Sequence, residues 1–551
     1  MSTRRYPASV LTALAGALAI YVALQLWLTR GTTLFIDEVT MFQQNGGLHP
    51  SALLAPFNEH LELARRLMYA ICLPLFGAGG SFLAARLIEV ASVGALVCVV
   101  FVFVSQRIGA AAALAPAILL LFFGSAWELN FAISGIGNVV ALAAGAGALL
   151  ALQRRSGQRD VIACVLLTLS IASFTTGLAF VVGAALLLWL EPCGRRRLWV
   201  AVFPLALYAA WLAWVRLVYV PANGEAQHLT LSNVLLIPNM IVQQAASTAG
   251  ALTGTNFNFE PSDSFAVFST SSQYGAPFAA LAAGALIWRL RRGTRPMIWA
   301  LVATLLVYWS ELAIGSGLGR TPTTIRYVYA AGVITVLLAA AAAGHLLRGR
   351  KTLLILYSLV ALALLGNLAR LRDGMHFYRA FGTAMRAQLA AVEIASPSEP
   401  NQFQTHIGAP LFVPLTVGPY LAAVRRYGSP AFSQSQLLAQ PETLRENADS
   451  VLLAALQIHV AEVSAGAQLL HCNRPAGSSS LAVVVPPGGV GLRAAGTAQL
   501  SLSRYAAAPT PLGALHAGRQ VDVRIPRDRS GRPWRLTVTP VPARLAVCPL
   551  P

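Results

Sequence analysis

Long apolar runs separated by short clusters of arginine constrain this chain more than any other feature. The 551 residues are 56% hydrophobic and only 11% charged, whereas a soluble protein usually carries about a quarter charged residues. Apolar runs with so few charges suit the hydrocarbon of a membrane better than a buried core. We therefore predict a polytopic α-helical membrane protein with about eleven spans.

The first predicted span follows Arg4 and Arg5. It is longer than the apolar core of a typical signal peptide, so we interpret it as an uncleaved anchor. The amphipathic stretch 231–252 fits either a helix along the membrane surface or an ordinary loop helix. The predicted spans lie near residues 8–28, 82–105, 111–125, 135–152, 161–173, 175–190, 198–218, 275–290, 297–315, 327–347 and 353–368.

The basic clusters between these spans predict the orientation of the chain. If the sides alternate from a cytoplasmic N-terminus, every dense cluster falls on the cytoplasmic side, as the positive-inside rule requires. The predicted location is therefore a bacterial inner membrane, with multiple passes and a cytoplasmic N-terminus. The clusters are Arg107; Arg154, Arg155 and Arg159; Arg195, Arg196 and Arg197; Arg289, Arg291, Arg292 and Arg295; and Arg348, Arg350 and Lys351.

The formal net charge of +19 raises the question of a nucleic-acid partner. Nucleic-acid binding requires basic residues gathered on one soluble domain or face. Here they are distributed among short loops between apolar runs, so a nucleic-acid partner is excluded and membrane lipid is expected instead.

The character of the sequence changes after the last predicted span. We predict two domains, a transmembrane domain over 1–368 and an extracytoplasmic, mostly β (α+β) domain over 369–551. Short apolar runs bounded by turn residues indicate strands near 481–485, 521–525 and 535–539. Cys472 and Cys548 lie in this domain, and in an oxidising compartment they would form a disulfide bond; otherwise they are two free thiols.

Two adjacent acids, Asp37 and Glu38, follow the first predicted span by a few residues. Acids this close to a bilayer are costly unless they are solvated or paired. A carboxylate there could accept the proton of a sugar hydroxyl as that hydroxyl attacks an anomeric carbon. The alternative is a solvated acid pair at a helix end. Glu128, in the next predicted outer loop, fits an acid at the end of a helix.

Several arginines lie on the side where the charge rule predicts few. Arg65 and Arg66 follow the first outer loop, and Arg86 lies early in a span with Glu89 one helical turn later. Arg86 and Glu89 could form an intrahelical pair, worth a few tenths of a kcal/mol where exposed. Alternatively, these arginines hold a lipid-linked phosphate, which guanidinium groups bind well.

Arg320 and Arg326 lie in the outer loop before the penultimate predicted span. They could neutralise a lipid phosphate whose departure builds negative charge in a transition state. Alternatively, they extend along the membrane interface toward water. Glu311, inside the preceding span, is an intramembrane acid that could pair with one of them.

The segments after the first span occur in a recognisable order. Asp37-Glu38 is followed by His60, then by Phe76-Gly77, and then by Ala85-Arg86-Leu87. This order resembles the GT-C superfamily of membrane glycosyltransferases, which includes protein O-mannosyltransferases and the aminoarabinose transferases that modify lipid A. The family commonly has His-Pro-Pro, whereas this chain has His60-Leu61-Glu62. The match covers roughly the first 110 residues and extends loosely to residue 368.

The resemblance implies inverting transfer of a sugar from a polyprenyl-phosphate donor to a cell-envelope glycan, lipid or protein at the extracytoplasmic face. It implies Asp37 as the base, with Glu38 assisting and Glu128 as a second acid. Some members bind a divalent metal, Mg²⁺ or Mn²⁺, for which Asp37 and Glu38 would be the ligands, and others bind none. The predicted donor-phosphate ligands are Arg65, Arg66, Arg86, Arg320 and Arg326, and the predicted substrate-binding residues are Asn58, Glu59, His60 and Tyr327.

Two other functions stay open. A transporter or flippase of a lipid-linked glycan would favour inverted repeats and broken midplane helices, which the sequence does not reveal. It would also leave the surface acids without a role. A non-catalytic envelope scaffold could keep the same fold without the activity, because a fold alone does not fix a function.

Overall fold

The computed structural model describes residues 6–58, 60–192, 194–218, 231–256, 268–293, 295–315, 321–343, 349–397, 404–407, 413–463, 472–473 and 479–550. The chain forms two compact units. Unit 1 comprises Met1–Gly31, Gly46–Leu75 and Leu83–Tyr378, and unit 2 comprises Thr32–Asn45, Phe76–Phe82 and Arg379–Pro551.

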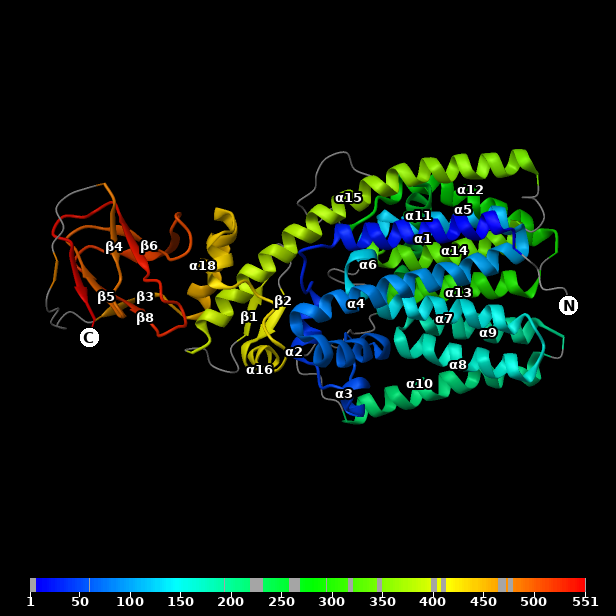
Figure 1. Ribbon diagram of the computed structural model, residues 1–551, viewed down its shortest axis with the longest axis horizontal. Coiled ribbons are helices and arrows are strands. Elements are labelled where there is room, and N and C mark those ends of the chain that lie inside the picture. The colour runs from blue at the N-terminus through cyan, green and yellow to red at the C-terminus, as the bar shows by residue number, and fades with distance from the viewer. Residues whose placement is uncertain are drawn as a thin grey trace. The chain divides into compact units, whose positions relative to one another are not determined.

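Unit 1 is a bundle of helices (Figure 1). Its helices are α1 (Ala8–Leu28), α3 (Pro50–Leu53), α4 (Leu63–Ile108), α5 (Ala110–Leu121), α6 (Trp127–Phe131), α7 (Ile136–Leu152), α8 (Gly157–Ser173), α9 (Thr176–Leu190), α10 (Trp199–Val218), α11 (Leu231–Thr253), α12 (Ser272–Arg291), α13 (Pro296–Ile314), α14 (Ile325–Ala343) and the first part of α15 (Arg350–Ala395), with the 3-10 turns η1 (Gly124–Ala126), η2 (Ile133–Gly135) and η3 (Gly194–Arg197). α4 includes a break at Gly77, where φ is 65°.

Each predicted span coincides with one of these helices. Among the described residues, seven helices are long and apolar enough to cross a membrane, and the bent pair Ala110–Leu121 and Gly124–Phe131 would make an eighth. The seven are Ala8–Leu28, Phe82–Ile108, Ile133–Leu152, Gly194–Val218, Pro296–Ile314, Ile325–Ala343 and Arg350–Ala395. The predicted class of polytopic helical membrane protein is thereby confirmed, while the count of about eleven spans and the orientation stay predictions.

Small residues bring the helices of unit 1 close together. A side chain at Gly145 in α7 would collide with the ring of Phe180 in α9, and one at Gly183 in α9 would collide with Thr304 in α13. Glycine at such contacts lets helix backbones approach closely, which is the usual basis of helix packing in lipid. These contacts fix α9 between α7 and α13.

Unit 2 contains two four-stranded antiparallel sheets, with strand orders β10-β5-β8-β3 and β4-β9-β6-β7. Buried residues pair across the second sheet, where Leu500 lies opposite Val538 and Leu502 opposite Leu536. The predicted strands appear as β4, β8 and β9, which confirms the mostly β character of this region. The elements are α2 (Asp37–Gln43), α16 (Val417–Tyr427), α17 (Gln434–Leu438), α18 (Glu442–Ala455), β1 (Gln404–Ile407), β2 (Val413–Thr416), β3 (Val460–Val463), β4 (Leu481–Val484), β5 (Gly488–Arg493), β6 (Ala498–Ser503), β7 (Thr510–Leu515), β8 (Gln520–Ile525), β9 (Arg535–Thr539) and β10 (Ala546–Pro549).

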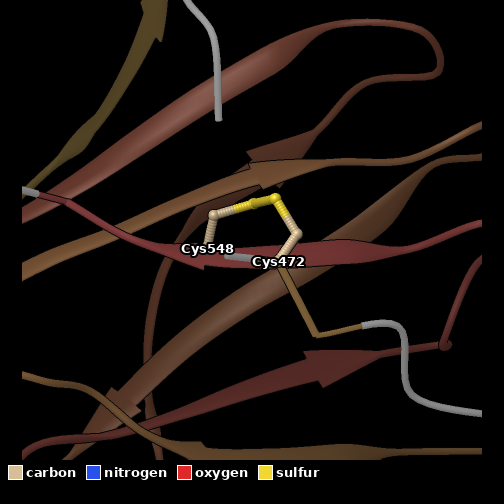
Figure 2. The surroundings of a disulfide bond; sticks show 2 residues. All are labelled: Cys472 and Cys548. Atoms are coloured by element: carbon tan, nitrogen blue, oxygen red, sulfur yellow. A yellow bond between two sulfur atoms is a disulfide. The ribbon is translucent and has the colours of Figure 1, made fainter. Parts of the chain in front are cut away.

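A disulfide bond joins Cys472 to Cys548 in β10 (Figure 2). The pairing is the one considered from the sequence, and it closes a loop with a sequence separation of 76 residues. Asn473, next to Cys472, also pairs with Val547 through two backbone hydrogen bonds of 3.0 Å. The disulfide bond therefore holds the short segment 472–473 against β10, the edge strand of the first sheet.

Replacing both Cys472 and Cys548 by alanine is expected to destabilise unit 2. Closing a loop of this length restricts the unfolded chain, and its loss typically costs about 2–5 kcal/mol. The measurement is the thermal unfolding and protease resistance of the full chain in detergent. The matched control replaces two buried free cysteines of unit 1, Cys72 and Cys164, by alanine. Equal stability of the two double variants would contradict a stabilising role for the disulfide bond.

Candidate functional site

The acid pair begins helix α2 in unit 2, and its two members have different environments. The side chain of Glu38 is fully buried, and its Oε2 accepts a hydrogen bond from the Phe35 backbone N–H at 3.0 Å. The backbone N–H of Glu38 in turn donates to the Phe35 carbonyl at 2.8 Å. Asp37 is only partly buried. Glu38 therefore closes the turn at the start of α2, and Asp37 is the member of the pair that solvent or a ligand can reach.

Other residues of the acidic segment hold it within unit 2. Phe42 packs against Tyr420 and Tyr427 of α16, with ring centroids 5.9 and 6.2 Å apart. The Thr416 backbone N–H donates to the Gln43 side-chain oxygen at 3.2 Å. The predicted domain boundary at 368/369 falls inside α15. By contacts within the chain, residues 32–45 group with the region after Tyr378.

The Phe76-Gly77 segment also belongs to unit 2. Gly77 has a φ of 65°, which L side chains rarely adopt, and a Cβ there would approach the Tyr427 carbonyl closely. Glycine is therefore required at this turn for two independent steric reasons.

In unit 1, Glu128 lies on the short helix α6 within a bent segment, residues 122–135, that joins α5 to α7 and includes the turns η1 and η2. The axes of Ala110–Leu121 and Gly124–Phe131 differ by 41°. Irregular backbone at membrane depth must find internal hydrogen-bond partners, because lipid offers none. Asn130, which is fully buried, supplies one by donating to the Phe123 carbonyl at 3.1 Å.

Arg86 of α4 supplies further partners for the bent segment. Its guanidinium donates to the carbonyls of Asn130, at 3.4 Å, and Phe131. It also forms an ion pair with Glu89 at 2.5 Å and donates to the Tyr378 hydroxyl at 3.0 Å. Arg86 is 1% exposed. The ion pair with Glu89 that the sequence suggested is therefore present, and the predicted phosphate-binding role of Arg86 stays a prediction.

The structure brings two predicted residues together at the bent segment. Arg326 Nε lies 3.8 Å from Glu128 Oε1, and the Arg326 side chain is 42% exposed. The neighbouring Tyr327 carbonyl accepts a hydrogen bond from the Tyr308 hydroxyl at 2.9 Å. The half-exposed guanidinium of Arg326 can therefore contact both a carboxylate of unit 1 and a ligand.

Arg65 and Arg66 begin the first helical part of α4 and are both buried. Arg65 forms an ion pair with Glu62 and lies over the ring of Phe57, 4.3 Å from its centroid. Arg66 donates to the Pro56 carbonyl at 3.1 Å. Both guanidinium groups thus brace the preceding loop, and their predicted phosphate-binding role stays a prediction.

Of the predicted substrate-binding residues, His60 contacts Thr175 and Phe174. Its Nδ1 is 3.3 Å from the Thr175 hydroxyl, and its ring lies 4.7 Å from that of Phe174. Asn58 has a positive φ of 44°, in the turn that pairs Phe57 with His60. Glu59 and Arg320 lie outside the described residues.

Sequence reasoning missed Arg370 and Asp373 of α15, both buried. Arg370 donates to the Ser269 carbonyl at 2.9 Å, and Ser269 pairs with Thr324, just before Arg326. Arg370 therefore supports the loop that precedes α14. The sequence did contain a signal for these two residues, since an arginine and an aspartate three positions apart follow directly after the last apolar run. Within the described ranges, no group of three or more His, Cys, Asp or Glu side chains could hold a metal ion.

No protein-family model and no curated protein matches the sequence. The structure is similar to ArnT from Cupriavidus metallidurans in the apo state, with 15% identity, 74% of this chain and 84% of that chain covered, and a TM-score of 0.46. ArnT from Cupriavidus metallidurans bound to undecaprenyl phosphate is 14% identical, with 77% of this chain and 86% of that chain covered and a TM-score of 0.46. The archaeal oligosaccharyltransferase AglB from Archaeoglobus fulgidus, in complex with an inhibitory peptide and a dolichol-phosphate, is 14% identical, with 71% of this chain and 58% of that chain covered and a TM-score of 0.42.

Because the identities and scores are low, the functional proposal rests on the residues of this chain.

Proposed function

We propose that the protein is a membrane glycosyltransferase that moves a sugar from a polyprenyl-phosphate donor to a cell-envelope acceptor at the extracytoplasmic face. The observation that carries the proposal is the asymmetry of the acid pair. Glu38 is buried and bonded to its own turn, whereas the adjacent Asp37 is partly exposed. Because Glu38 fixes the turn, the adjacent Asp37 is held at a defined position that solvent can reach. This arrangement suits a general base.

The proposed reaction is a single inverting displacement. The acceptor hydroxyl oxygen forms a bond to the anomeric carbon from the face opposite the phosphate. The bond between that carbon and the phosphate oxygen breaks, and the polyprenyl phosphate leaves with the bonding electron pair. Asp37 takes the hydroxyl proton as the new bond forms. Glu38 acts as a positioning residue because it fixes the turn from which Asp37 extends.

The leaving polyprenyl phosphate gains negative charge, which cationic donors stabilise in the transition state. We assign this role in unit 1 to Arg326, whose guanidinium is half-exposed and loosely paired with Glu128 at 3.8 Å. A guanidinium can present two parallel N–H groups to a phosphate. Arg86 and Arg370 are assigned positioning roles, because their contacts support the backbone segments that carry Glu128 and Arg326.

The extracytoplasmic location of the C-terminal region is part of the proposal. The positive-inside pattern predicts it, and the disulfide bond between Cys472 and Cys548 is of a kind that persists in oxidising compartments. Both observations support the same side of the membrane and depend on different residues.

The experiment compares cells that carry the intact gene with cells that lack it. Envelope glycans, glycolipids and glycoproteins are analysed by mass spectrometry, together with the polyprenyl-phosphate sugars. The proposal predicts that one acceptor loses a sugar and that one polyprenyl-phosphate sugar accumulates on the extracytoplasmic leaflet. Accumulation of a lipid-linked glycan on the cytoplasmic leaflet would instead identify a flippase, and unchanged sugars would favour a scaffold.

A further inference from the structure

Two connections in unit 1 share an unusual pattern of exposed tryptophans and arginines. Trp189 lies next to the last residue of α9 and Trp199 begins α10; their side chains are 53% and 45% exposed. Trp288 near the end of α12 and Trp299 near the start of α13 are 50% and 40% exposed. Between each pair of tryptophans lies a cluster of exposed arginines, Arg195 and Arg196 in one connection, and Arg291, Arg292 and Arg295 in the other.

Direct contacts link the arginines to the tryptophans. The guanidinium carbon of Arg195 lies 4.4 Å from the ring centroid of Trp189, and that of Arg292 lies 4.0 Å from Trp288. These are cation–π distances. Tryptophan rings settle at the level of lipid headgroups, so each contact holds a guanidinium at headgroup depth and leaves its N–H edges available.

The nearby acids do not neutralise these arginines. Asp160 accepts from Arg197 at 2.5 Å, and Glu191 is 3.4 Å from Arg197 and 3.9 Å from Arg155. Among the described residues, these are the acids at this end of the bundle, and both are engaged by other arginines. The exposed arginines therefore form an uncompensated positive surface.

The two connections lie at the same end of unit 1, where α1 begins (Figure 1). α9 and α13 pack closely, as Gly183 and Thr304 show. The Arg289 Nε donates to the Ala342 carbonyl at 3.1 Å, which joins the end of α12 to the end of α14. The Arg197–Asp160 pair likewise joins the α9–α10 connection to α8.

We propose that the two tryptophan-flanked arginine clusters bind the headgroup phosphates of anionic phospholipids. Each basic side chain near an anionic leaflet adds about 1 kcal/mol of attraction, and exposed guanidinium forks match phosphate oxygens. This proposal is independent of the glycosyltransferase proposal, because it concerns neither the acids nor the bent segment.

The test measures bound lipid on the full chain by native mass spectrometry in detergent, with added phosphatidylglycerol or phosphatidylcholine as the probe. The wild-type protein is expected to retain phosphatidylglycerol in preference to phosphatidylcholine. The double variants Arg195→Gln/Arg196→Gln and Arg291→Gln/Arg292→Gln are each expected to lower phosphatidylglycerol retention at least about fivefold. Retention of phosphatidylcholine should not change.

The matched control is Arg425→Gln/Arg426→Gln, an exposed pair of adjacent arginines in α16 of unit 2. This control removes the same amount of positive charge, but its helix contains no exposed tryptophan beside the two arginines. Equal loss of phosphatidylglycerol in the control, or equal retention of the two lipids by the wild-type protein, would overturn the proposal. A normal thermal unfolding curve for each variant separates lost lipid binding from misfolding.

Discussion

Replacing Asp37 by asparagine is expected to lower the rate of sugar transfer by about 10²–10⁴-fold while leaving the amount of protein in the membrane unchanged. A general base contributes acceleration of this size, and asparagine keeps the shape of aspartate without accepting the proton. Asp37 is partly exposed, so the asparagine side chain can still reach solvent. The measurement is recovery of the missing envelope sugar when the variant is expressed in cells that lack the gene.

Two further variants make this result specific. Glu462→Gln, an exposed acid on β3, removes the same charge from unit 2 and is expected to restore transfer fully. Glu38→Leu is expected to reduce both transfer and thermal stability, because leucine offers no acceptor to the buried Phe35 N–H. Full recovery of the envelope sugar by Asp37→Asn would refute the assignment of Asp37 as the base.

Replacing Arg86 by methionine is expected to destabilise unit 1 by about 3–5 kcal/mol, the usual cost of leaving one member of a buried ion pair without its partner. Glu89 would stay fully buried beside an apolar side chain. The carbonyls of Asn130 and Phe131 would also lose a hydrogen-bond donor. The measurement is thermal unfolding of the purified protein in detergent, together with its level in the membrane.

The double variant Arg86→Met/Glu89→Leu separates the cost of an unpaired buried charge from the cost of the lost hydrogen bonds to the backbone carbonyls. Removing both charges should recover part of the stability, because no buried charge stays unpaired. Arg86→Lys keeps a charge but loses the planar fork that serves several acceptors at once, so it should recover only part as well. Arg154→Met, at an exposed position, is the control. If Arg86→Met unfolded like this control, the positioning role of Arg86 would be wrong.

Features that depend on neighbours along the chain could be predicted from the sequence. Each predicted span coincides with a helix, and the strands near 481–485, 521–525 and 535–539 appear as β4, β8 and β9. Apolar length and strand composition are local properties, so they can be recognised without knowing the fold. The order of Asp37, His60, Gly77 and Arg86 likewise predicted a functional region, because a motif is a local pattern too.

The surroundings of the residues within that region depend on residues far away in the sequence, and only the tertiary structure shows them. Adjacent acids are alike in sequence, yet Glu38 is buried and bonded while Asp37 is partly exposed. For Arg86 the sequence left open an ion pair with Glu89 and a phosphate-binding role, and the structure shows the ion pair together with contacts to the bent segment and Tyr378. Burial and hydrogen-bond partners arise when distant segments pack, and no local pattern encodes which segments those are.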